Sequence, residues 1–333
     1  MSRILITGGA GYVGSLLTIN LEQLGHEVLI YDTCYYGKDH IKISNKLKLI
    51  EGDIRDTSKF ESAVEGCDVI IHLACISNDP SFALNEELSK TINFDCFEDL
   101  VKVSKKNRIK RFIYASSSSV YGFSDNDNVT EEHPLVPLTL YNKFKGMCEP
   151  ILKKYTDENF VGTIVRPATI CGYAPRCRLD LSVNILTNFA VNNKKIVVLG
   201  GGEQKRPNLH VADMCRAYEY FLNAESEKIN NEIFNVSYEN KKIIELAHIV
   251  KKNVENFFRF EDIKIEVKNE TLDKRSYHVN SEKIKKVLGF FPKFNIDDAV
   301  VSLCEAFKKN RLPNSLSDPK YINVTMLKNS NAF

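Results

Sequence analysis

Short apolar runs alternate with longer amphipathic stretches over the first half of the chain. The apolar runs have the length of buried strands, and the stretches between them carry the three-to-four-residue periodicity of helices. The expected strands are residues 3–6, 28–31, 47–50, 69–73, 111–115 and 162–165, and the clearest helices are 86–106 and 139–155. This alternation predicts an α/β fold, a doubly wound parallel sheet with right-handed crossovers. Ligands of such a sheet bind at the carboxyl ends of the strands.

A glycine-rich turn follows the first expected strand. Residues 7–14 read TGGAGYVG, so glycine recurs at every third position and the next helix opens within the motif. Glycine permits the tight turn, and the helix N-terminus offers free N–H groups and a positive dipole end to a diphosphate. The candidate cofactor contacts are Gly8, Gly11, Tyr12, Val13 and Gly14. An ordinary strand–turn–helix capped by glycines is the alternative interpretation.

Asp32 favours the dinucleotide interpretation of this turn. It follows the second expected strand, about twenty residues after the glycines, which is the spacing of a dinucleotide-binding βαβ unit. A carboxylate at this position accepts hydrogen bonds from the adenosine ribose hydroxyls and repels a 2′-phosphate. The sequence therefore predicts NAD as the cofactor and disfavours NADP.

The alternation becomes less regular after about residue 173. Helices are expected at 180–191, 211–222, 243–258, 281–288 and 296–309, with a short strand at 196–199. We therefore expect an NAD-binding Rossmann domain over residues 1–172, a smaller mixed C-terminal lobe over 173–312 that binds the substrate, and a tail over 313–333. Later segments such as 211–236 are expected to return to the Rossmann domain. The turn-rich tail is expected to pack on the surface or on a partner.

Composition narrows the class of protein. The 333 residues carry a net charge of +2, so we expect no binding of nucleic acid. The nine cysteines contain no C-x-x-C pair, which is typical of reduced thiols in the cytoplasm. The apolar runs are too short for a membrane span, the N-terminus lacks the pattern of a signal peptide, and the isolated histidines indicate no metal site. We expect a cytoplasmic protein without a metal or a membrane segment.

Tyr141 and Lys145 lie four residues apart in an expected helix and therefore share one face. An ammonium group beside a phenol lowers the phenol pKa, and a shift of roughly three units, about 4 kcal/mol, is needed for tyrosine to act as a base near neutrality. Such pairs are common on solvated helix faces. The glycine turn and the upstream serine run at 116–119 favour a catalytic role here, in which Tyr141 takes a hydroxyl proton while hydride leaves the same carbon for NAD.

These motifs together resemble the extended short-chain dehydrogenase/reductases that act on nucleotide-diphosphate sugars. The resemblance runs from the first strand to about Phe294. It implies cofactor contacts at Asp53, Ile54, Leu73, Ala74, Asn93 and Pro167, in addition to Tyr141 and Lys145. It also implies a catalytic serine at Ser117, and substrate contacts at Ser118, Ser119, Asn184, Arg206 and Arg275, the two arginines on the diphosphate. Ser116 is expected to have only a structural role, with its hydroxyl capping the next turn.

Three departures from the family pattern bear on the reaction and the substrate. The 4,6-dehydratases carry acidic residues where this chain has Ser118 and Ser119, so dehydration is disfavoured. Thr169 and Cys171 replace a usual Asn and Tyr, which puts the usual sugar contacts in doubt. The charged run 175–181 is either a solvated loop or, through Arg176, a recognition element for a polar sugar or a guanine base.

Within this family, the chain is most similar to a branch from bacterial capsule gene clusters that includes an NAD-dependent dehydrogenase of GDP-manno-heptose. The resemblance implies oxidation of the C4 hydroxyl to a 4-keto sugar, with a small 2-keto acid as a candidate hydride acceptor. A nucleotide-sugar 4-epimerase is the alternative, and a 4,6-dehydratase or a non-catalytic NAD-binding sensor is less favoured. The resemblance also implies a homodimer in which helices 86–106 and 139–155 pair across a two-fold axis; otherwise their apolar faces are filled by the same chain.

Overall fold

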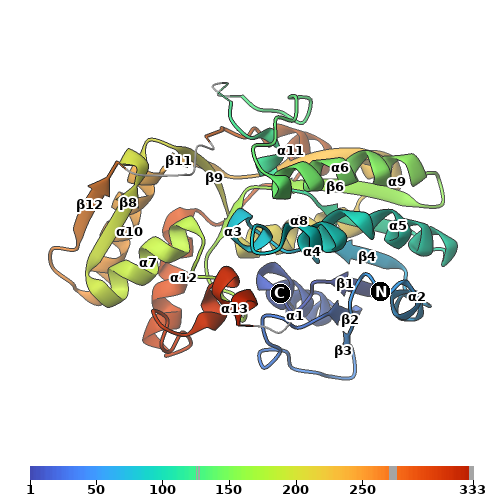
Figure 1. Ribbon diagram of the computed structural model, residues 1–333, viewed down its shortest axis with the longest axis horizontal. Coiled ribbons are helices and arrows are strands. Elements are labelled where there is room, and N and C mark those ends of the chain that lie inside the picture. Colours follow the sequence, from blue (N-terminus) through green and yellow to red (C-terminus); the bar gives the residue numbers. More distant parts are fainter. Residues whose placement is uncertain (125, 127, 270–275, 330–333) are drawn as a thin grey trace.

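A computed structural model describes residues 1–124, 126, 128–269 and 276–329 (Figure 1). Its centre is a seven-stranded sheet in the order β10-β6-β5-β4-β1-β2-β3, with every neighbouring pair parallel. The strands are β1 (Arg3–Thr7), β2 (Glu27–Asp32), β3 (Leu47–Glu51), β4 (Val69–His72), β5 (Arg111–Ala115), β6 (Val161–Pro167) and β10 (Glu232–Val236). The predicted doubly wound parallel sheet is confirmed. The strand order reverses between β1 and β4, where such sheets bind ligands.

Helices cover both faces of this sheet because successive strand residues point to opposite sides. Ile4 and Ile6 pack toward α1 (Tyr12–Gln23), α8 (Val211–Asn223) and α11 (Glu282–Leu288). Leu5, between them, packs toward α2 (Thr57–Val64), α5 (Phe97–Lys106) and α6 (Leu140–Tyr155). The strands are apolar on both faces, as buried parallel strands are.

The stretch expected as one helix over 86–106 is divided in the structure. It consists of α4 (Glu86–Lys90), the π-helical turn η1 (Thr91–Asp95) and α5. The turn carries Asn93, whose amide accepts from the Ile76 N–H at 2.8 Å and donates to the Ile76 carbonyl at 3.0 Å. A side-chain contact of this kind gives no periodic signal in the sequence. The helix expected at 139–155 begins at Leu140, with Thr139 as its N-cap.

A second group of elements lies to the left in Figure 1, around its own apolar core. It contains α7 (Ser182–Asn193), α10 (Ile243–Phe258), α12 (Ile296–Lys308) and the parallel pair β8 (Lys195–Leu199) and β12 (Lys264–Lys268). A three-stranded sheet of β7 (Thr169–Cys171), β9 (Lys205–His210) and β11 (Glu239–Lys242) also lies outside the main sheet. Between these elements the chain returns to the main sheet as α8 and β10.

Short elements complete the described chain. They are α3 (Asp79–Phe82), η2 (Ser118–Tyr121), η3 (Gly200–Gly202), α9 (Ser226–Ile229), η4 (Pro319–Tyr321) and α13 (Asn323–Lys328). The last two belong to the tail, which packs on its own chain: the Tyr321 carbonyl accepts from the Leu179 N–H at 2.9 Å, and Leu327 is fully buried. In the described residues no helix combines the length and the apolar character that a membrane span requires.

Candidate functional site

A cavity of about 770 Å³ opens at the carboxyl ends of the main strands, where the strand order reverses. Residues from both groups of elements line it. Eighteen of the expected site residues are in its lining: Gly8, Gly11, Tyr12, Val13, Gly14, Asp32, Asp53, Ile54, Leu73, Ala74, Ser117, Ser118, Ser119, Tyr141, Lys145, Pro167, Arg176 and Arg206. Parallel strands bring these side chains together because all their carboxyl ends meet at one edge.

The glycine turn leaves no room for a side chain at Gly8 or at Gly14. Gly8 has φ +74°, and a Cβ there would lie 2.6 Å from the Ala74 nitrogen at the end of β4. A Cβ on Gly14 would lie 2.6 Å from the Gly8 carbonyl oxygen. Gly8 therefore packs closely against the backbone that follows β4, and Gly14 packs against the turn itself, which leads into the N-terminus of α1. This is a cradle that fits a dinucleotide diphosphate.

Asp32 lies at the end of β2 on the cavity wall. Its carboxylate accepts the Ala10 N–H at 3.0 Å and the Cys34 N–H at 2.8 Å. Burial raises the pKa of this carboxyl, and the two backbone hydrogen bonds oppose that shift. The side chain is thus fixed beside the glycine turn, on the wall of the cavity.

The three predicted catalytic side chains line the same cavity as Asp32. Lys145 is buried, and its ammonium donates to the Ala115 carbonyl at 2.7 Å, at the end of β5. Tyr141, one turn earlier on α6, lines the cavity and is partly exposed. Ser117 caps η2, and its hydroxyl oxygen lies 2.7 Å from that of Ser119. The arrangement can take a proton from a bound hydroxyl group and hold its oxygen.

A buried ion pair supports the serine segment from behind. Arg166 donates to both oxygens of Glu149, at 2.9 and 2.6 Å, and also to the Tyr121 hydroxyl at 2.8 Å. The Ser116 hydroxyl donates to Glu149 at 2.6 Å. Ser116 lies in the cavity lining, but its hydroxyl is held by Glu149 and does not cap the next turn as expected; Ser117 is the cap.

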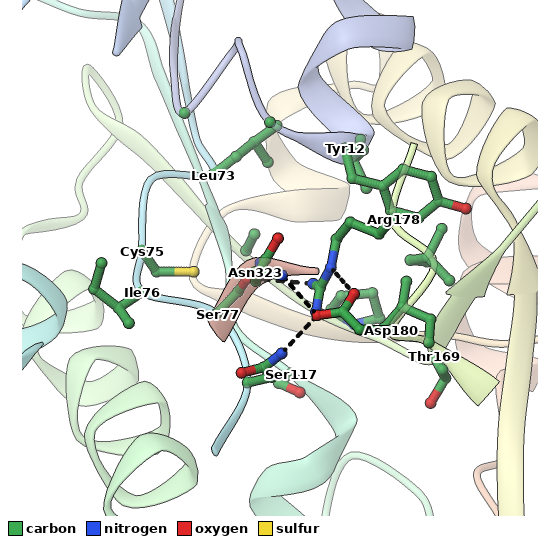
Figure 2. Close-up of a pocket in the computed structure, with 18 of the residues that line it drawn as sticks. Tyr12, Leu73, Cys75, Ile76, Ser77, Ser117, Thr169, Arg178, Asp180 and Asn323 are labelled. Atoms are coloured by element: carbon green, nitrogen blue, oxygen red, sulfur yellow. Dashed lines mark hydrogen bonds and ion pairs between the residues drawn. The ribbon is translucent and has the colours of Figure 1, made fainter. Parts of the chain in front are cut away.

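The charged run 175–181 is buried and not solvated. Arg178 donates to Asp180 at 2.9 and 3.1 Å and to the Ser77 hydroxyl at 3.2 Å (Figure 2). Burial opposes the charge of Arg178, but Asp180 holds its pKa above the ordinary value. The guanidinium carbon of Arg176 lies 4.5 Å from the centre of the Tyr36 ring. Burial, together with the charge of Arg178, lowers the pKa of Arg176 to about 10. Asp180 neutralises one of the two arginines, so this wall carries one net positive charge, which fits an anionic ligand.

Two expected contacts lie outside the cavity lining, and a third cannot be placed. Asn93 pairs with Ile76, as described above. Asn184 accepts the Gly172 N–H at 2.9 Å and donates to the Arg178 carbonyl at 2.8 Å and the Tyr12 hydroxyl at 3.0 Å. Both asparagines hold loops in place behind the wall. Arg275 lies outside the described residues.

Sequence reasoning did not assign several polar residues of the site, and four of them bear on the argument. Ser77, Arg178 and Asn323 line the cavity, and Asn142 contacts Ser119. Asn142 follows Tyr141 directly, and Arg178 lies in the charged run, so both carried a positional signal. Asn323 gave none, because only the folded chain brings the tail to the cavity. In the described part of the chain, no cluster of three or more metal-ligating side chains is present.

Comparisons with known proteins find relatives in sequence and in fold. The chain is 32% identical over 254 residues to a UDP-N-acetyl-alpha-D-glucosaminuronate decarboxylase from Bacillus cytotoxicus, covering 73% of this chain and 77% of that protein. It is 27% identical to the mouse dTDP-D-glucose 4,6-dehydratase, covering 92% and 89%. A UDP-glucose 4-epimerase structure with UDP-glucose, from Thermotoga maritima, superposes with a TM-score of 0.82 at 23% identity, covering 92% and 99%.

The cofactor prediction agrees with the family assignment. Residues 4–237, from β1 to the strand that returns to the sheet, match a family described as NAD dependent epimerase/dehydratase. This span contains the glycine turn, Asp32 and the Ser117, Tyr141 and Lys145 constellation. The chain belongs to the NAD dependent epimerase/dehydratase family.

Proposed function

We propose that the protein oxidises the C4 hydroxyl of a nucleotide-diphosphate sugar with NAD, giving a 4-keto sugar. The observation that carries the proposal is that Ser117, Tyr141 and Lys145 line the same cavity as the glycine turn and Asp32. The relatives named above bear the names of enzymes of nucleotide sugars. A GDP-linked heptose is our candidate substrate and surface polysaccharide synthesis our candidate pathway.

Each of the three residues has a separate role in the proposed reaction. Tyr141, as phenolate, takes the proton of the C4 hydroxyl. Lys145 stabilises the phenolate, and its bond to the Ala115 carbonyl fixes the ammonium in place. Ser117 hydrogen-bonds the oxygen as it becomes a carbonyl oxygen. NAD accepts the hydride when it is bound.

The acidic residues of the cavity argue against dehydration. Ser118 and Ser119 cannot serve as acid and base at their ordinary pKa values. Asp180 is paired with Arg178, and Asp79 accepts the Thr139 hydroxyl at 2.5 Å. Asp32 and Asp53 lie at the expected adenosine end. We therefore place the reaction before any loss of the C6 hydroxyl.

A decarboxylase is the second candidate, because a relative with 32% identity carries that name. Oxidation at C4 of a uronic acid sugar gives a β-keto acid; it loses carbon dioxide to form an enolate, which then takes a proton at C5 from water. The same catalytic residues would then suffice. A 4-epimerase also begins with this oxidation and differs only in returning the hydride to the other face.

Product analysis separates these reactions. Purified protein is incubated with GDP-mannose, a GDP-heptose, UDP-glucose and UDP-glucuronate, with and without a 2-keto acid, and products are identified by mass spectrometry and NMR. A 4-keto sugar from a GDP-linked substrate, formed in proportion to the keto acid, supports the dehydrogenase. A C4-inverted sugar, a decarboxylated sugar or a 4-keto-6-deoxy sugar would each replace it with the corresponding reaction.

We further propose a homodimer formed by α5 and α6. Leu140 and Met147 on α6 are 37% and 38% exposed, and exposed charged pairs join Lys102 of α5 and Lys154 of α6 to Glu98. A two-fold pairing of these helices would cover the apolar side chains. Light scattering at micromolar concentration should give twice the chain mass, and Met147→Glu should weaken the association. A stable wild-type monomer would contradict the proposal.

A further inference from the structure

Ser117, Ser119 and Asn142 form a chain of side-chain contacts that ends at the cavity. The hydroxyl oxygens of Ser117 and Ser119 lie 2.7 Å apart, and the Ser119 hydroxyl contacts the side-chain amide of Asn142. Asn142 is fully buried and is not in the cavity lining. The direction of the protons along this chain decides what Ser117 can offer to a substrate.

One direction disables Ser117 as a donor. If Asn142 presents Oδ1, Ser119 donates its only hydroxyl proton to it, and Ser117 must donate to Ser119. Ser117 Oγ also accepts the Ser119 backbone N–H at 3.2 Å. Ser117 would then turn a lone pair toward the substrate oxygen. As that oxygen becomes a carbonyl oxygen, the contact would be repulsive.

The opposite direction pairs the buried groups better. With Oδ1 toward Ser119, Asn142 Nδ2 is buried and has no hydrogen-bond partner in the described part of the chain. An amide turned by half a rotation has the same shape and presents Nδ2 to Ser119 instead. The group left unpaired is then a carbonyl oxygen, which proteins tolerate more often than an unpaired N–H donor.

We propose that Asn142 is a positioning residue of the reaction. Its Nδ2 donates to Ser119, Ser119 donates to Ser117, and Ser117 donates to the substrate oxygen. The inference rests on the proposed function, because it takes the reacting oxygen to be that of the sugar hydroxyl. It also gives Ser119 a role in the place where dehydratases carry an acid: Ser119 relays a hydrogen bond.

Substitutions that reverse or break the chain test this proposal. Asn142→Asp keeps the shape of the side chain, but a carboxylate can only accept hydrogen bonds. On the nucleotide sugar that the wild type oxidises, kcat should therefore fall roughly 100-fold. KM for that sugar and Kd for NAD should stay near wild type, because Asn142 lies behind the cavity wall. Ser119→Ala frees the Ser117 proton and should reduce kcat by less than about tenfold.

The double variant separates positioning from damage to the fold. Without the Ser119 hydroxyl the carboxylate cannot redirect Ser117, so Ser119→Ala with Asn142→Asp should be no slower than Ser119→Ala alone. Losses that multiply would overturn the proposal, since independent structural effects add in free energy. Asn159→Asp makes the same change on an exposed turn and should match the wild type.

An NMR measurement tests the chain without any substrate. In protein labelled with ¹⁵N at asparagine side chains, the Asn142 signals are identified by their absence in Asn142→Asp. One Asn142 Nδ2 proton should lie downfield and move upfield in Ser119→Ala; signals unchanged in that variant would overturn the proposal. A failure of the proposed function appears separately, as wild-type protein that forms no NADH with any sugar of the panel.

Discussion

Asp180 and Asn323 are 143 residues apart in the chain, yet the backbone N–H of Asn323 donates to Asp180 Oδ2 at 3.1 Å. The Asn323 side chain extends the contact: it donates to the Ser77 hydroxyl at 2.9 Å and accepts from Arg176 at 2.5 Å. Figure 2 shows Asn323 among Ser77, Arg178 and Asp180. The tail therefore completes the cavity wall that carries both arginines.

The first prediction concerns this wall. Asn323→Ala removes the hydrogen bond from the Arg176 guanidinium, and a bond to a charged group contributes about 1.5–3 kcal/mol. We expect a loss of stability of that order in urea and faster release of bound NAD in stopped-flow fluorescence. Asn329→Ala, exposed in the same segment, is the control. If the two variants behave alike, the tail does not stabilise the cavity.

The second prediction concerns cofactor selection. Asp32→Ser removes the carboxylate that would bind the ribose and repel a 2′-phosphate, so the preference for NAD over NADP should fall by roughly tenfold or more. Asp53→Asn is the matched control: it should change the affinity for both cofactors equally, because they share the adenine ring. Calorimetric titration with each dinucleotide gives both ratios. An unchanged ratio in Asp32→Ser would show that another residue selects the cofactor.

The parts of the fold that repeat a local pattern were predictable. The parallel strands and the helices at 139–155, 211–222 and 243–258 follow from periodic apolar residues, and the structure has them within a few residues. The division of 86–106 at η1 was not predictable, because it comes with a tertiary contact between Asn93 and Ile76. The short strands β7, β9 and β11 were not predicted, because their apolar residues are isolated or interrupted by polar ones.

The site also has parts that the sequence predicts and parts that it does not. Spacing in the sequence identifies the glycine turn, Asp32 and the Tyr141–Lys145 pair, and all of them line the cavity. Asn184, an expected substrate contact, lies outside the cavity lining, and its amide bonds to Gly172 and Arg178. Whether an amide faces a ligand or a loop is decided by packing, which spacing alone does not encode.

The third prediction concerns pH. His72 is buried in β4, where its ring contacts the Thr7 hydroxyl at 2.8 Å, and burial lowers its pKa to about 3. The unfolded chain has the ordinary value near 6.5, so below that pH the unfolded state binds one more proton than the folded state. His72 therefore costs stability as pH falls, at about 1.4 kcal/mol per pH unit, until about pH 3.

His72→Gln removes the titrating ring and keeps a hydrogen-bonding group for Thr7. Its unfolding free energy, measured in urea from pH 7 to about pH 4, should fall less steeply than that of the wild type, by up to the slope just given. Above pH 7, where His72 is neutral in both the folded and the unfolded state, the two free energies should change with pH at the same rate. Parallel curves for the two proteins would show that His72 is not neutral in the folded state.

The last prediction concerns the base. Tyr141→Phe removes one oxygen from the cavity and leaves the ring, the Lys145 anchor at Ala115 and the glycine turn in place. General base catalysis contributes typically 10² to 10⁴ in rate, so kcat should fall by about that factor. Affinity for NAD should change little. Tyr155→Phe makes the same change at the far end of α6, where the hydroxyl donates to Glu98, and should keep full activity. Reduction of NAD in a single turnover, followed by NADH absorbance, isolates the chemical step from product release. If Tyr141→Phe keeps more than a few per cent of that rate, another group takes the proton, and Ser117 with Lys145 would be the first to test.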